Sequence, residues 1–570
     1  MKRGLSAAPL LSTVELRGCS SLPRVLSRPS SSLSASSLPG LSVRPFSAAP
    51  SPPPKQSAAA SASAAAAASL ADSLDAKLSD VNFDDKASST SKADLKPYEA
   101  IPGPKGYPIV GNLIEFLRYP GGLRKMHMKM DDMVKTYGPL VRYDLFGSKR
   151  LLLADADEVA RVHQAAGKVP RRPDVPVWTI FRKSRNLFPG ILQVNGEEWV
   201  RFRRVLSEKL LRMPVVEQWV PAMVEVGADL VKLMRNSRVD SSGHIPHVEN
   251  LLSRFGIEAV GTVIFDARVG CLVPNPDPSV QKFVKAINGL LDASHKLLYG
   301  APFYLLFNTP TWNKMAQCFD DVKEVGELHV ERKLKEIRKL VEEKGEDALQ
   351  DNPSFLAHLL SKDGLTAEEI STNCIDLLAA GVDTTAFTVL FTLYELSRHP
   401  EAQAKLHQEL DEVLGNEKPT VETLKRLPYL KACVREGLRL HPITVLYTRI
   451  LEQEFDMLGY RIPAGVSVDM LSPTLAKMEK YFPKSEEYRP ERWLTGEYHP
   501  YAATPFGFGP RMCVGRRVAE AEVHSVIAQI MQAFDVRFAG EKTPDQIMTL
   551  ILVPNEPVKL CFTDRKPASK

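Results

Sequence analysis

The segment FGFGPRMCVG, Phe506 to Gly515, limits what this chain of 570 residues can form more than any other stretch. Gly507, Gly509 and Gly515 allow the backbone to come close to a flat neighbouring group, where a Cβ atom would collide. Cys513 lies just before a predicted helix that begins near Gly515, where free amides and the positive helix end favour a thiolate over a thiol. The segment therefore predicts a rigid loop that presents one anionic sulfur.

A thiolate is a soft metal ligand, and a single cysteine supplies only one such ligand. The seven cysteines lie far apart without a CxxC pair, so neither a zinc ribbon nor a disulfide framework is expected. The metal must then bring its other ligands with it. Heme iron does so, with four porphyrin nitrogens in plane and a thiolate as the fifth, electron-donating ligand.

The loop resembles the heme-binding signature of the cytochrome P450 family, FxxGxRxCxG, at Phe506, Gly509, Arg511, Cys513 and Gly515. Taken alone, the loop could also be a glycine-rich turn around a structural cysteine. The resemblance implies that Cys513 is the metal ligand and that the cofactor is heme b (iron protoporphyrin IX). It also implies a mainly α fold with small β-sheets (α+β), in which a single large helical domain surrounds a buried heme.

Two further segments match the same family in its chain order. REGLR places Glu436 and Arg439 three residues apart on one helix face and resembles the ExxR motif, while RPERW supplies Arg492, the arginine that completes a buried network. For Glu436 and Arg439 alone, a surface ion pair is the alternative. The resemblance implies that this network locks the core around the heme.

Cofactor-binding arginines are implied by the resemblance only. WVRFR places Trp199 and Arg203 on one helix face and resembles the family helix that pairs with a heme propionate. Arg511, and Arg449 in HPITVLYTRIL, fall where the family supplies further propionate partners. Isolated arginines and tryptophans more often pack or face solvent.

The segment AAGVDTT interrupts an apolar helical stretch with Gly381, Asp383 and Thr384, which are poor choices for a helix interior. It predicts a kink, and it resembles the family's (A/G)GxDT segment, which lines a groove for O2. The resemblance implies catalytic roles for both polar residues, with the Thr384 hydroxyl assisting oxygen activation and Asp383 supplying protons. A glycine kink with a capping threonine is the alternative.

The net charge of +5 comes from the first 50 residues, which hold six basic residues against Glu15 alone. A basic, acid-poor segment rich in Ser, Ala and Leu is typical of an organelle transit peptide, and a disordered tail is the alternative. We therefore expect a mitochondrial transit peptide over residues 1–46, a low-complexity linker over 47–96, one heme-thiolate domain over 97–566 and a tail over 567–570. The neutral remainder of the chain gives no indication of nucleic-acid binding.

Electrons must come from a partner, because the chain contains no flavin or nicotinamide fingerprint and no iron–sulfur cysteine cluster. Lys431, Arg435, Arg516 and Arg517 match positions where mitochondrial members carry cations that dock an acidic [2Fe-2S] ferredoxin, itself reduced by ferredoxin reductase and NADPH. An ordinary solvated basic face is the alternative. The resemblance thus implies an enzyme of the mitochondrial inner membrane, on the matrix side.

The substrate is implied least clearly. The pocket segments that the family suggests are mostly apolar, which favours a lipophilic substrate such as a sterol, steroid, secosteroid or xenobiotic. HKLLYGAPFYLLF, residues 295–307, has the composition of a segment that dips into a membrane, although ordinary core packing is equally compatible. Apolar runs elsewhere are too short or too interrupted to span a bilayer, so we expect peripheral membrane association.

Three classes of function remain open at this point. The first is a mitochondrial monooxygenase that uses O2 and ferredoxin electrons. The second is a heme-thiolate isomerase or dehydratase that rearranges peroxides without external electrons, although such relatives typically lose the acid–threonine pair. The third is a non-catalytic heme sensor or carrier, which would need neither the oxygen groove nor the docking cations.

Local patterns also predict individual elements. These are a hairpin in LVRYDLFGSKRLLLADA, a capping box of Thr366 and Glu369, a helix from Pro400 to about Gly415, strands in RIPAGVSVDM and a helix in RRVAEAEVHSVIAQIMQAF.

Overall fold

The computed structural model describes residues 94–345, 354–362 and 365–565. The predicted transit peptide, nearly all of the predicted linker and the tail lie outside these residues. The described residues all fall within one compact unit. β1 (Lys96–Pro97) is their first strand, close to the predicted domain start at residue 97.

Helices make up most of the described chain, as the sequence predicts, and several begin at the expected caps. Their bounds are α2 Leu113–Arg118, α3 Met126–Tyr137, α4 Ala156–Ala165, α5 Pro176–Ser184, α6 Gly196–Leu210, α7 Met213–Val216, α8 Val220–Asn236, α9 Val248–Phe265, α10 Pro278–Tyr299, α11 Pro310–Lys344, α12 Phe355–Leu360, α13 Ala367–Arg398, α14 Pro400–Val413, α15 Val421–Lys425, α16 Pro428–Leu440, α17 Ser472–Ala476, α18 Arg492–Thr495 and α19 Arg516–Ala533. Four short 3-10 helices lie at η1 Tyr98–Ala100, η2 Gly122–Lys125, η3 Glu217–Trp219 and η4 Phe303–Leu305.

The strands form small separate sheets. Their bounds are β2 Leu140–Leu145, β3 Ser148–Leu153, β4 Leu446–Ile450, β5 Phe455–Met457, β6 Tyr460–Ile462, β7 Ser467–Leu471, β8 Phe534–Phe538, β9 Gln546–Met548, β10 Leu552–Pro554 and β11 Leu560–Asp564. The largest sheet has the order β2-β3-β7-β4, with β3 and β7 parallel and both outer pairs antiparallel. β1-β6-β5 form a second sheet, and β9-β10 and β8-β11 form two-stranded ones.

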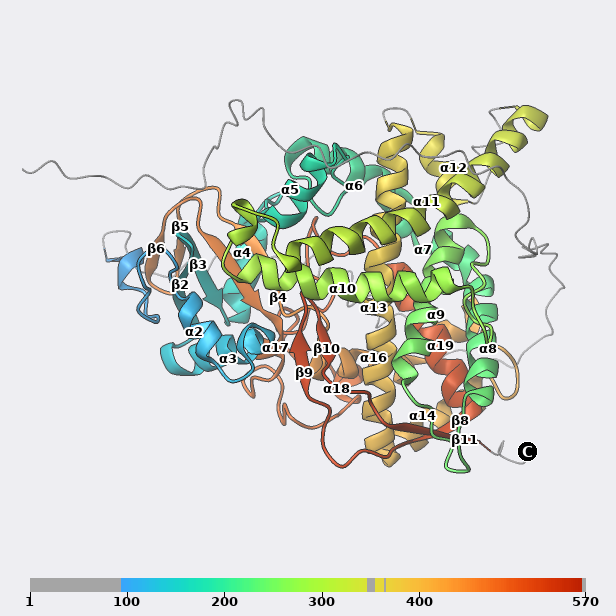
Figure 1. Ribbon diagram of the computed structural model, residues 1–570. Coiled ribbons are helices and arrows are strands. Elements are labelled where there is room, and N and C mark those ends of the chain that lie inside the picture. The colour runs from blue at the N-terminus through green and yellow to red at the C-terminus, as the bar shows by residue number, and fades with distance from the viewer. Residues whose placement is uncertain (1–93, 346–353, 363–364, 566–570) are drawn as a thin grey trace, which may run out of the picture. The chain divides into compact units, whose positions relative to one another are not determined.

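The predicted hairpin is confirmed as β2 and β3, whose register pairs Leu140 with Leu153. Phe146 and Gly147 form its two-residue turn with φ of 54° and 80°, the combination that a tight hairpin requires. The predicted strands after Pro442 are confirmed as β6 and β7. In Figure 1 the largest sheet lies on one side of the molecule, beside the helices α9, α13 and α16.

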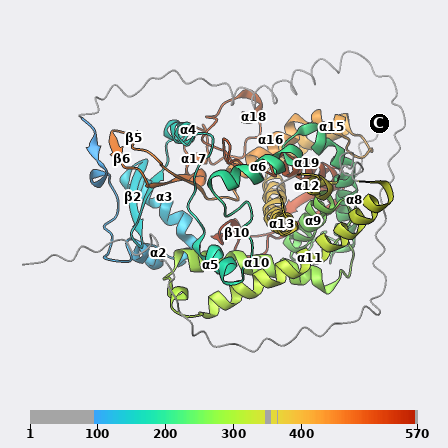
Figure 2. The ribbon, with the colours of Figure 1, turned by 90° about the horizontal axis from the view of Figure 1, so that it is seen from above.

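The helix α13 runs through the helical part, with α9, α16 and α19 packed against it and α10 and α11 side by side across it (Figures 1 and 2). Its start is the predicted capping box: Thr366 Oγ1 accepts from Glu369 N, and the Glu369 carboxylate accepts from Thr366 N. α13 is α-helical without interruption over 32 residues, through the AAGVDTT segment.

The glycine of that segment also has a packing reason. A Cβ atom on Gly381 would lie 2.6 Å from Val260 Cγ2 on α9, and a Cβ atom on Gly256 of α9 would lie 2.6 Å from Val382 O. Small residues on both helices therefore let α9 and α13 approach closely. The glycine at this position therefore has a packing reason that the sequence pattern did not indicate, while the predicted kink stays a prediction.

Among the described residues, α13 is also the one helix long and apolar enough to cross a membrane, and 72% of its most apolar window is buried inside the protein. Such burial is typical of a core helix. α19 and α14 confirm the other two predicted helices. Along α19, Val523, Val526, Ile527, Ile530 and Met531 are buried and Ala519 is half-buried, while Phe534 begins β8.

Candidate functional site

The loop before α19 is built as the sequence predicts. Gly507 and Gly509 adopt φ of 71° and 70°, in the left-handed region that favours glycine. The backbone of Cys513 donates to Phe506 O at 2.8 Å, and Met512 N donates to Gly509 O at 2.9 Å. These cross-loop bonds hold the cysteine at a fixed place immediately before the helix.

The Cys513 side chain is accessible, yet enough protein surrounds it that burial raises the pKa of the thiol. A side chain that is both accessible and surrounded faces a space inside the protein. The Gly515 amide and nearby Arg203 and Arg516 lower the pKa, but less than burial raises it. The helix start alone therefore does not produce the predicted thiolate, whereas coordination to a metal ion would deprotonate the sulfur.

A second accessible surface lies in the middle of α13. Ala380 is exposed and Thr384 is half-buried, although Val382 and Asp383 beside them are buried. Thr385 Oγ1 donates to Glu522 of α19 at 3.4 Å, so this part of α13 lies against the helix that follows the Cys513 loop. An exposed residue within a core helix indicates an internal space alongside it.

The polar residues of α13 lie where the sequence predicts, with distinct partners. The Thr384 hydroxyl donates to Ala380 O at 2.7 Å. Asp383 accepts from Ser253 Oγ of α9 at 3.4 Å, its second oxygen has no partner, and burial raises its pKa to about 7. The Asp383 carboxyl group can therefore both hold and release a proton near neutral pH.

Glu522 is a residue that sequence reasoning missed. Burial raises its pKa to about 8, Thr385 lowers it by donating a hydrogen bond, and Oε1 has no partner. One protonatable group, Asp383, thus directly precedes Thr384 in the chain, and the other, Glu522, contacts Thr385, the residue that follows it. The available signal was a glutamate on the otherwise apolar face of the predicted helix, since Glu522 is spaced with Val518, Val526 and Gln529.

The predicted propionate ligands meet around Arg511. Its guanidinium lies 4.3 Å from the ring centre of Trp199. It donates to Pro170 O at 2.9 Å, to Val194 O at 3.0 Å and to Asn195 Oδ1 at 2.7 Å. Nη1 has no partner. One arm of a fixed guanidinium is left to bind an acceptor that the protein does not provide.

Four arginines of this region repel one another. Burial, followed by the charges of Arg172, Arg449 and Arg203, lowers the pKa of Arg511 to about 9. Burial and Arg172 likewise lower the pKa of Arg449 to about 10, and its Nε has no partner. Burial also lowers the pKa of Arg203, and nearby Cys513 offsets this only in part. A cluster of cations with unpaired donors fits an anionic ligand with two carboxylates.

Two members of this cluster were missed by sequence reasoning. Arg172 exchanges backbone and side-chain hydrogen bonds with Asn195 and lies beside Arg449 and Arg511. His163 packs edge-on against Phe508 of the cysteine loop, and its buried Nε2 has no partner. No local sequence pattern distinguishes them, because both are brought to the site by loops and helices distant from Cys513.

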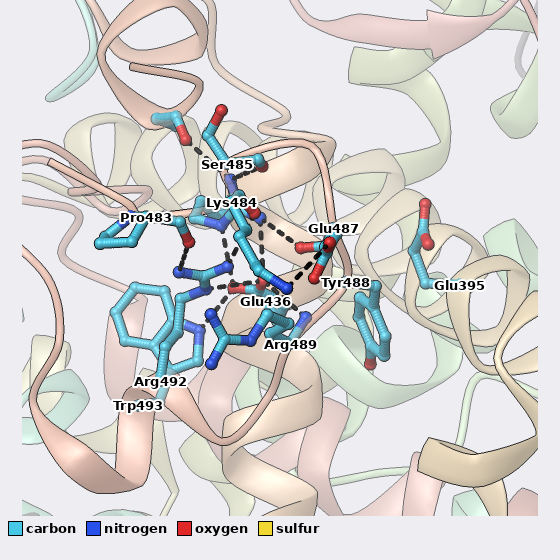
Figure 3. A network of polar contacts seen from close by, with 12 residues as sticks. Glu395, Glu436, Pro483, Lys484, Ser485, Glu487, Tyr488, Arg489, Arg492 and Trp493 are labelled. Atoms are coloured by element: carbon cyan, nitrogen blue, oxygen red, sulfur yellow. Dashed lines mark hydrogen bonds and ion pairs between the residues drawn. The ribbon is translucent and has the colours of Figure 1, made fainter. Parts of the chain in front are cut away.

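The predicted network is fully assembled (Figure 3). Glu436 accepts from Arg439 at 2.8 and 2.9 Å, from Arg492 Nε at 3.0 Å and from Trp493 Nε1 at 2.8 Å, and neither arginine side chain is exposed. The remaining guanidinium donors bind carbonyl oxygens of the segment 476–487. The surface ion pair considered from sequence is thus excluded for Glu436 and Arg439.

The four predicted docking cations lie on α16 and at the start of α19. Lys431 and Arg435 both lower the pKa of His524 on α19, after burial, to about 3, which places them beside that helix. Arg516 and Arg517 pair with Glu520 at 2.9 and 3.2 Å. All four side chains are half-buried.

This set of donors fits heme. A single accessible cysteine supplies one soft ligand, left-handed glycines keep the loop backbone clear of side chains, and the arginine cluster provides partners for two propionates. No group of three or more His, Cys, Asp or Glu residues in the described part of the chain could hold a bare metal ion. The six described cysteines are free thiols.

Comparison with known proteins agrees with this arrangement. The sequence model of the family described as Cytochrome P450 matches residues 101–562. Cytochrome P450 10 of Lymnaea stagnalis is 31% identical over 483 residues, 83% of this chain and 87% of that protein. The mitochondrial 25-hydroxyvitamin D-1 alpha hydroxylase of Homo sapiens is 33% identical over 82% of this chain and 92% of its own length. The mitochondrial cholesterol side-chain cleavage enzyme of Oncorhynchus mykiss is 30% identical over 80% and 88%.

Proposed function

The chain belongs to the cytochrome P450 family as a heme-thiolate monooxygenase of the mitochondrial type, and we propose that it hydroxylates a lipophilic, sterol-like substrate with electrons from a [2Fe-2S] ferredoxin. The accessible Cys513 sulfur in its fixed loop carries this proposal. When bound, heme supplies the activation of O2, so that one oxygen atom enters a C–H bond and the other leaves as water.

The cofactor-binding residues follow from the arrangement of the site. Cys513 binds the iron, and Arg203, Arg449 and Arg511 bind the propionates beside Trp199. Arg172 and His163 join them, since Arg172 lies beside Arg449 and Arg511, and Arg449 lowers the pKa of His163 after burial does so. Phe506, Gly509 and Gly515 shape the loop under the ring.

We assign proton delivery to Asp383 and Thr384 of α13. The pKa of Asp383, raised to about 7, allows this carboxyl group to carry a proton at neutral pH. Ser253 is the one direct partner of the Asp383 carboxyl group and binds Oδ1, while Oδ2 has none. A proton on Oδ2 can therefore be passed on only after a small rearrangement or through water. The Thr384 hydroxyl, half-buried beside exposed Ala380, orients the proton that reaches the oxygen to be released as water.

The cations of α16 and α19 support a ferredoxin as electron donor. Lys431 and Arg435 of α16 lie near His524 of α19, and Arg516 and Arg517 stand at the start of α19. An acidic partner docked there would approach the sulfur side of the heme. Such docking is electrostatic, so its rate falls as salt increases.

The substrate class and the location rest on two observations. The relatives named above include proteins described as mitochondrial and as acting on a vitamin D compound or cholesterol. In η4 and just beyond it, Phe303, Leu305, Leu306 and Phe307 expose between 51% and 80% of their surface, which suits insertion into the interface of the inner membrane. The basic composition of residues 1–46 supports import to the matrix side.

The test is to purify the protein with heme and to record its reduced carbon monoxide spectrum. NADPH consumption is then measured with ferredoxin and ferredoxin reductase over a panel of sterols and secosteroids. A thiolate-type band with reductase-dependent product formation is expected. Turnover of a lipid peroxide without electrons would instead identify an isomerase, and binding without any turnover a sensor or carrier.

A further inference from the structure

A buried ion pair joins α5 to the core helix α13. Arg182 Nη2 donates to Asp376 Oδ1 at 2.6 Å, with 8% and 9% of the two side chains exposed. Arg182 Nη1 also donates to Phe188 O at 2.8 Å. One side chain thus fixes both the end of its own helix and the irregular segment after it onto α13. Neither charge has a role in the proposed heme chemistry.

The segment after α5 is fitted closely around this pair. A Cβ atom on Gly190 would lie 2.0 Å from Asp376 Oδ2, so only glycine leaves room for the carboxylate. The next residue, Ile191, donates its N–H to Asn373 Oδ1 at 2.9 Å, and Asn373 is one turn before Asp376 on α13. Residues 182–191 are therefore held to α13 by two buried polar contacts and a tight backbone approach.

α5 is also tied to α10 and α11, and the Arg182 guanidinium itself lies 5.6 Å from the ring centre of Phe319 on α11. Trp178 Nε1 donates to Ser294 Oγ of α10 at 2.8 Å. The ring of Phe181 stacks on Phe319 of α11 at 4.7 Å. α5 therefore bridges the core helix and the α10–α11 pair that lies across it (Figure 2). We therefore expect loss of the Arg182–Asp376 contact to let α5 and the segment after it shift relative to α13.

The contact lies next to the accessible stretch of α13. Asp376 precedes exposed Ala380 by four residues, ~6 Å along a helix, and precedes Thr384 by ~12 Å. The segment 182–191 is thus placed at one end of the internal space that the site residues border. A substrate that reaches Thr384 must therefore pack against residues of this segment.

We propose that Arg182 and Asp376 are positioning residues for the substrate: their ion pair sets where residues 182–191 stand beside the α13 space, and so which carbon of the substrate is presented for oxidation. This inference rests on the proposed function, because it assigns a wall to the same site. The pair acts through the segment and does not itself contact the reacting atoms.

The test compares the variants D376N and R182K with the wild-type holoenzyme. D376N keeps the volume of the side chain and removes its charge, while R182K keeps the charge and removes the second contact to Phe188. R185Q is the matched control, because Arg185 caps the same helix and pairs with Asp320 of α11 at 3.0 Å on the surface. Hydrogen–deuterium exchange of residues 182–191 is measured first.

We expect exchange in this segment to become at least about tenfold faster in D376N, with a smaller change in R182K and less than about a twofold change in R185Q. The second readout is the affinity of two heme ligands, followed by the Soret shift. Ketoconazole is long enough to lie along the pocket wall, whereas imidazole is not. D376N should weaken ketoconazole binding at least about tenfold and imidazole binding less than about twofold.

Unchanged exchange in both variants would overturn the proposal, and so would faster exchange with unchanged ketoconazole affinity. If D376N fails to fold, hydrogen–deuterium exchange and ketoconazole affinity of R182K test the proposal instead. Neither readout requires turnover. A wild-type protein that binds azoles but oxidises no sterol would therefore contradict the proposed function and leave this test intact.

Discussion

The Arg439 guanidinium donates two hydrogen bonds to the Glu436 carboxylate, at 2.8 and 2.9 Å, and no part of either side chain is exposed. Arg492 and Trp493 donate to the same carboxylate. One carboxylate therefore pairs with two buried guanidinium groups at the point where α16, α18 and the segment between them meet.

Replacing Glu436 by alanine should destabilise the protein by about 3–5 kcal/mol, because it leaves two buried guanidinium groups without their anion. Urea unfolding and the yield of heme-loaded protein measure the effect. The control is K405A, which breaks the exposed Lys405–Glu491 pair and should cost no more than about 1 kcal/mol. Equal losses in the two variants would show that the network adds nothing to stability.

Replacing Cys513 by serine should abolish heme incorporation and activity while the protein still folds, because the cysteine side chain is accessible and serine nearly preserves its volume. Absorbance in the Soret region and far-UV circular dichroism separate the two effects. C561S, at a free thiol in β11, is the control and should retain the pigment. A coloured, active C513S protein would contradict the assigned ligand.

Replacing Thr384 by alanine should leave heme and substrate binding unchanged but divert most electrons to hydrogen peroxide, since the hydroxyl that orients the proton is lost. T384S keeps that hydroxyl and should remain coupled. The measurement is the ratio of product formed to NADPH consumed, with peroxide determined in parallel. Equal coupling in T384A and the wild type would remove the proposed role.

The double charge reversal K431E/R435E should raise the KM for ferredoxin at least about tenfold with little change in kcat, because docking is lost and chemistry is not. The salt dependence of turnover should flatten in the same variant. K339E, at an exposed lysine of α11, is the control. Wild-type turnover that ignores ionic strength would refute electrostatic docking.

Glu522 should make folding stability depend on pH. Its pKa is raised from 4.5 to about 8 by burial, so the stability that its neutral form provides is complete below pH ~4.5 and is lost as the pH rises to ~8. E522Q cannot ionise. Relative to the wild type, it should gain about 3–5 kcal/mol of stability between pH 4.5 and 9.

Urea midpoints of E522Q and wild-type protein at several pH values measure this difference. E541Q, at an exposed glutamate, should follow the wild type throughout. The same pH dependence in E522Q and the wild type would mean that Glu522 is already charged when folded at neutral pH.

Much of the fold could be predicted because its signals are local. The Thr366–Glu369 cap, the β2–β3 turn and the glycine loop before α19 each depend on residues a few positions apart, and the structure confirms all three. The sequence did not predict that Gly381 lies against Val260 of another helix, 2.6 Å from where a Cβ atom would stand. A sequence pattern shows that a position is unusual without showing which distant neighbour makes it so.

The sequence by itself determined the motifs: one cysteine in a glycine loop, the Glu436–Arg439 spacing and the acid–threonine pair. Only the tertiary structure decided how they act. It brought Arg172 and His163 to the arginine cluster, and it raised the pKa of the Cys513 thiol above the value that the helix start favours. It also set Glu522 beside Thr385 and paired Arg182 with Asp376. Burial and charge depend on which distant segments surround a group, and no local spacing records that.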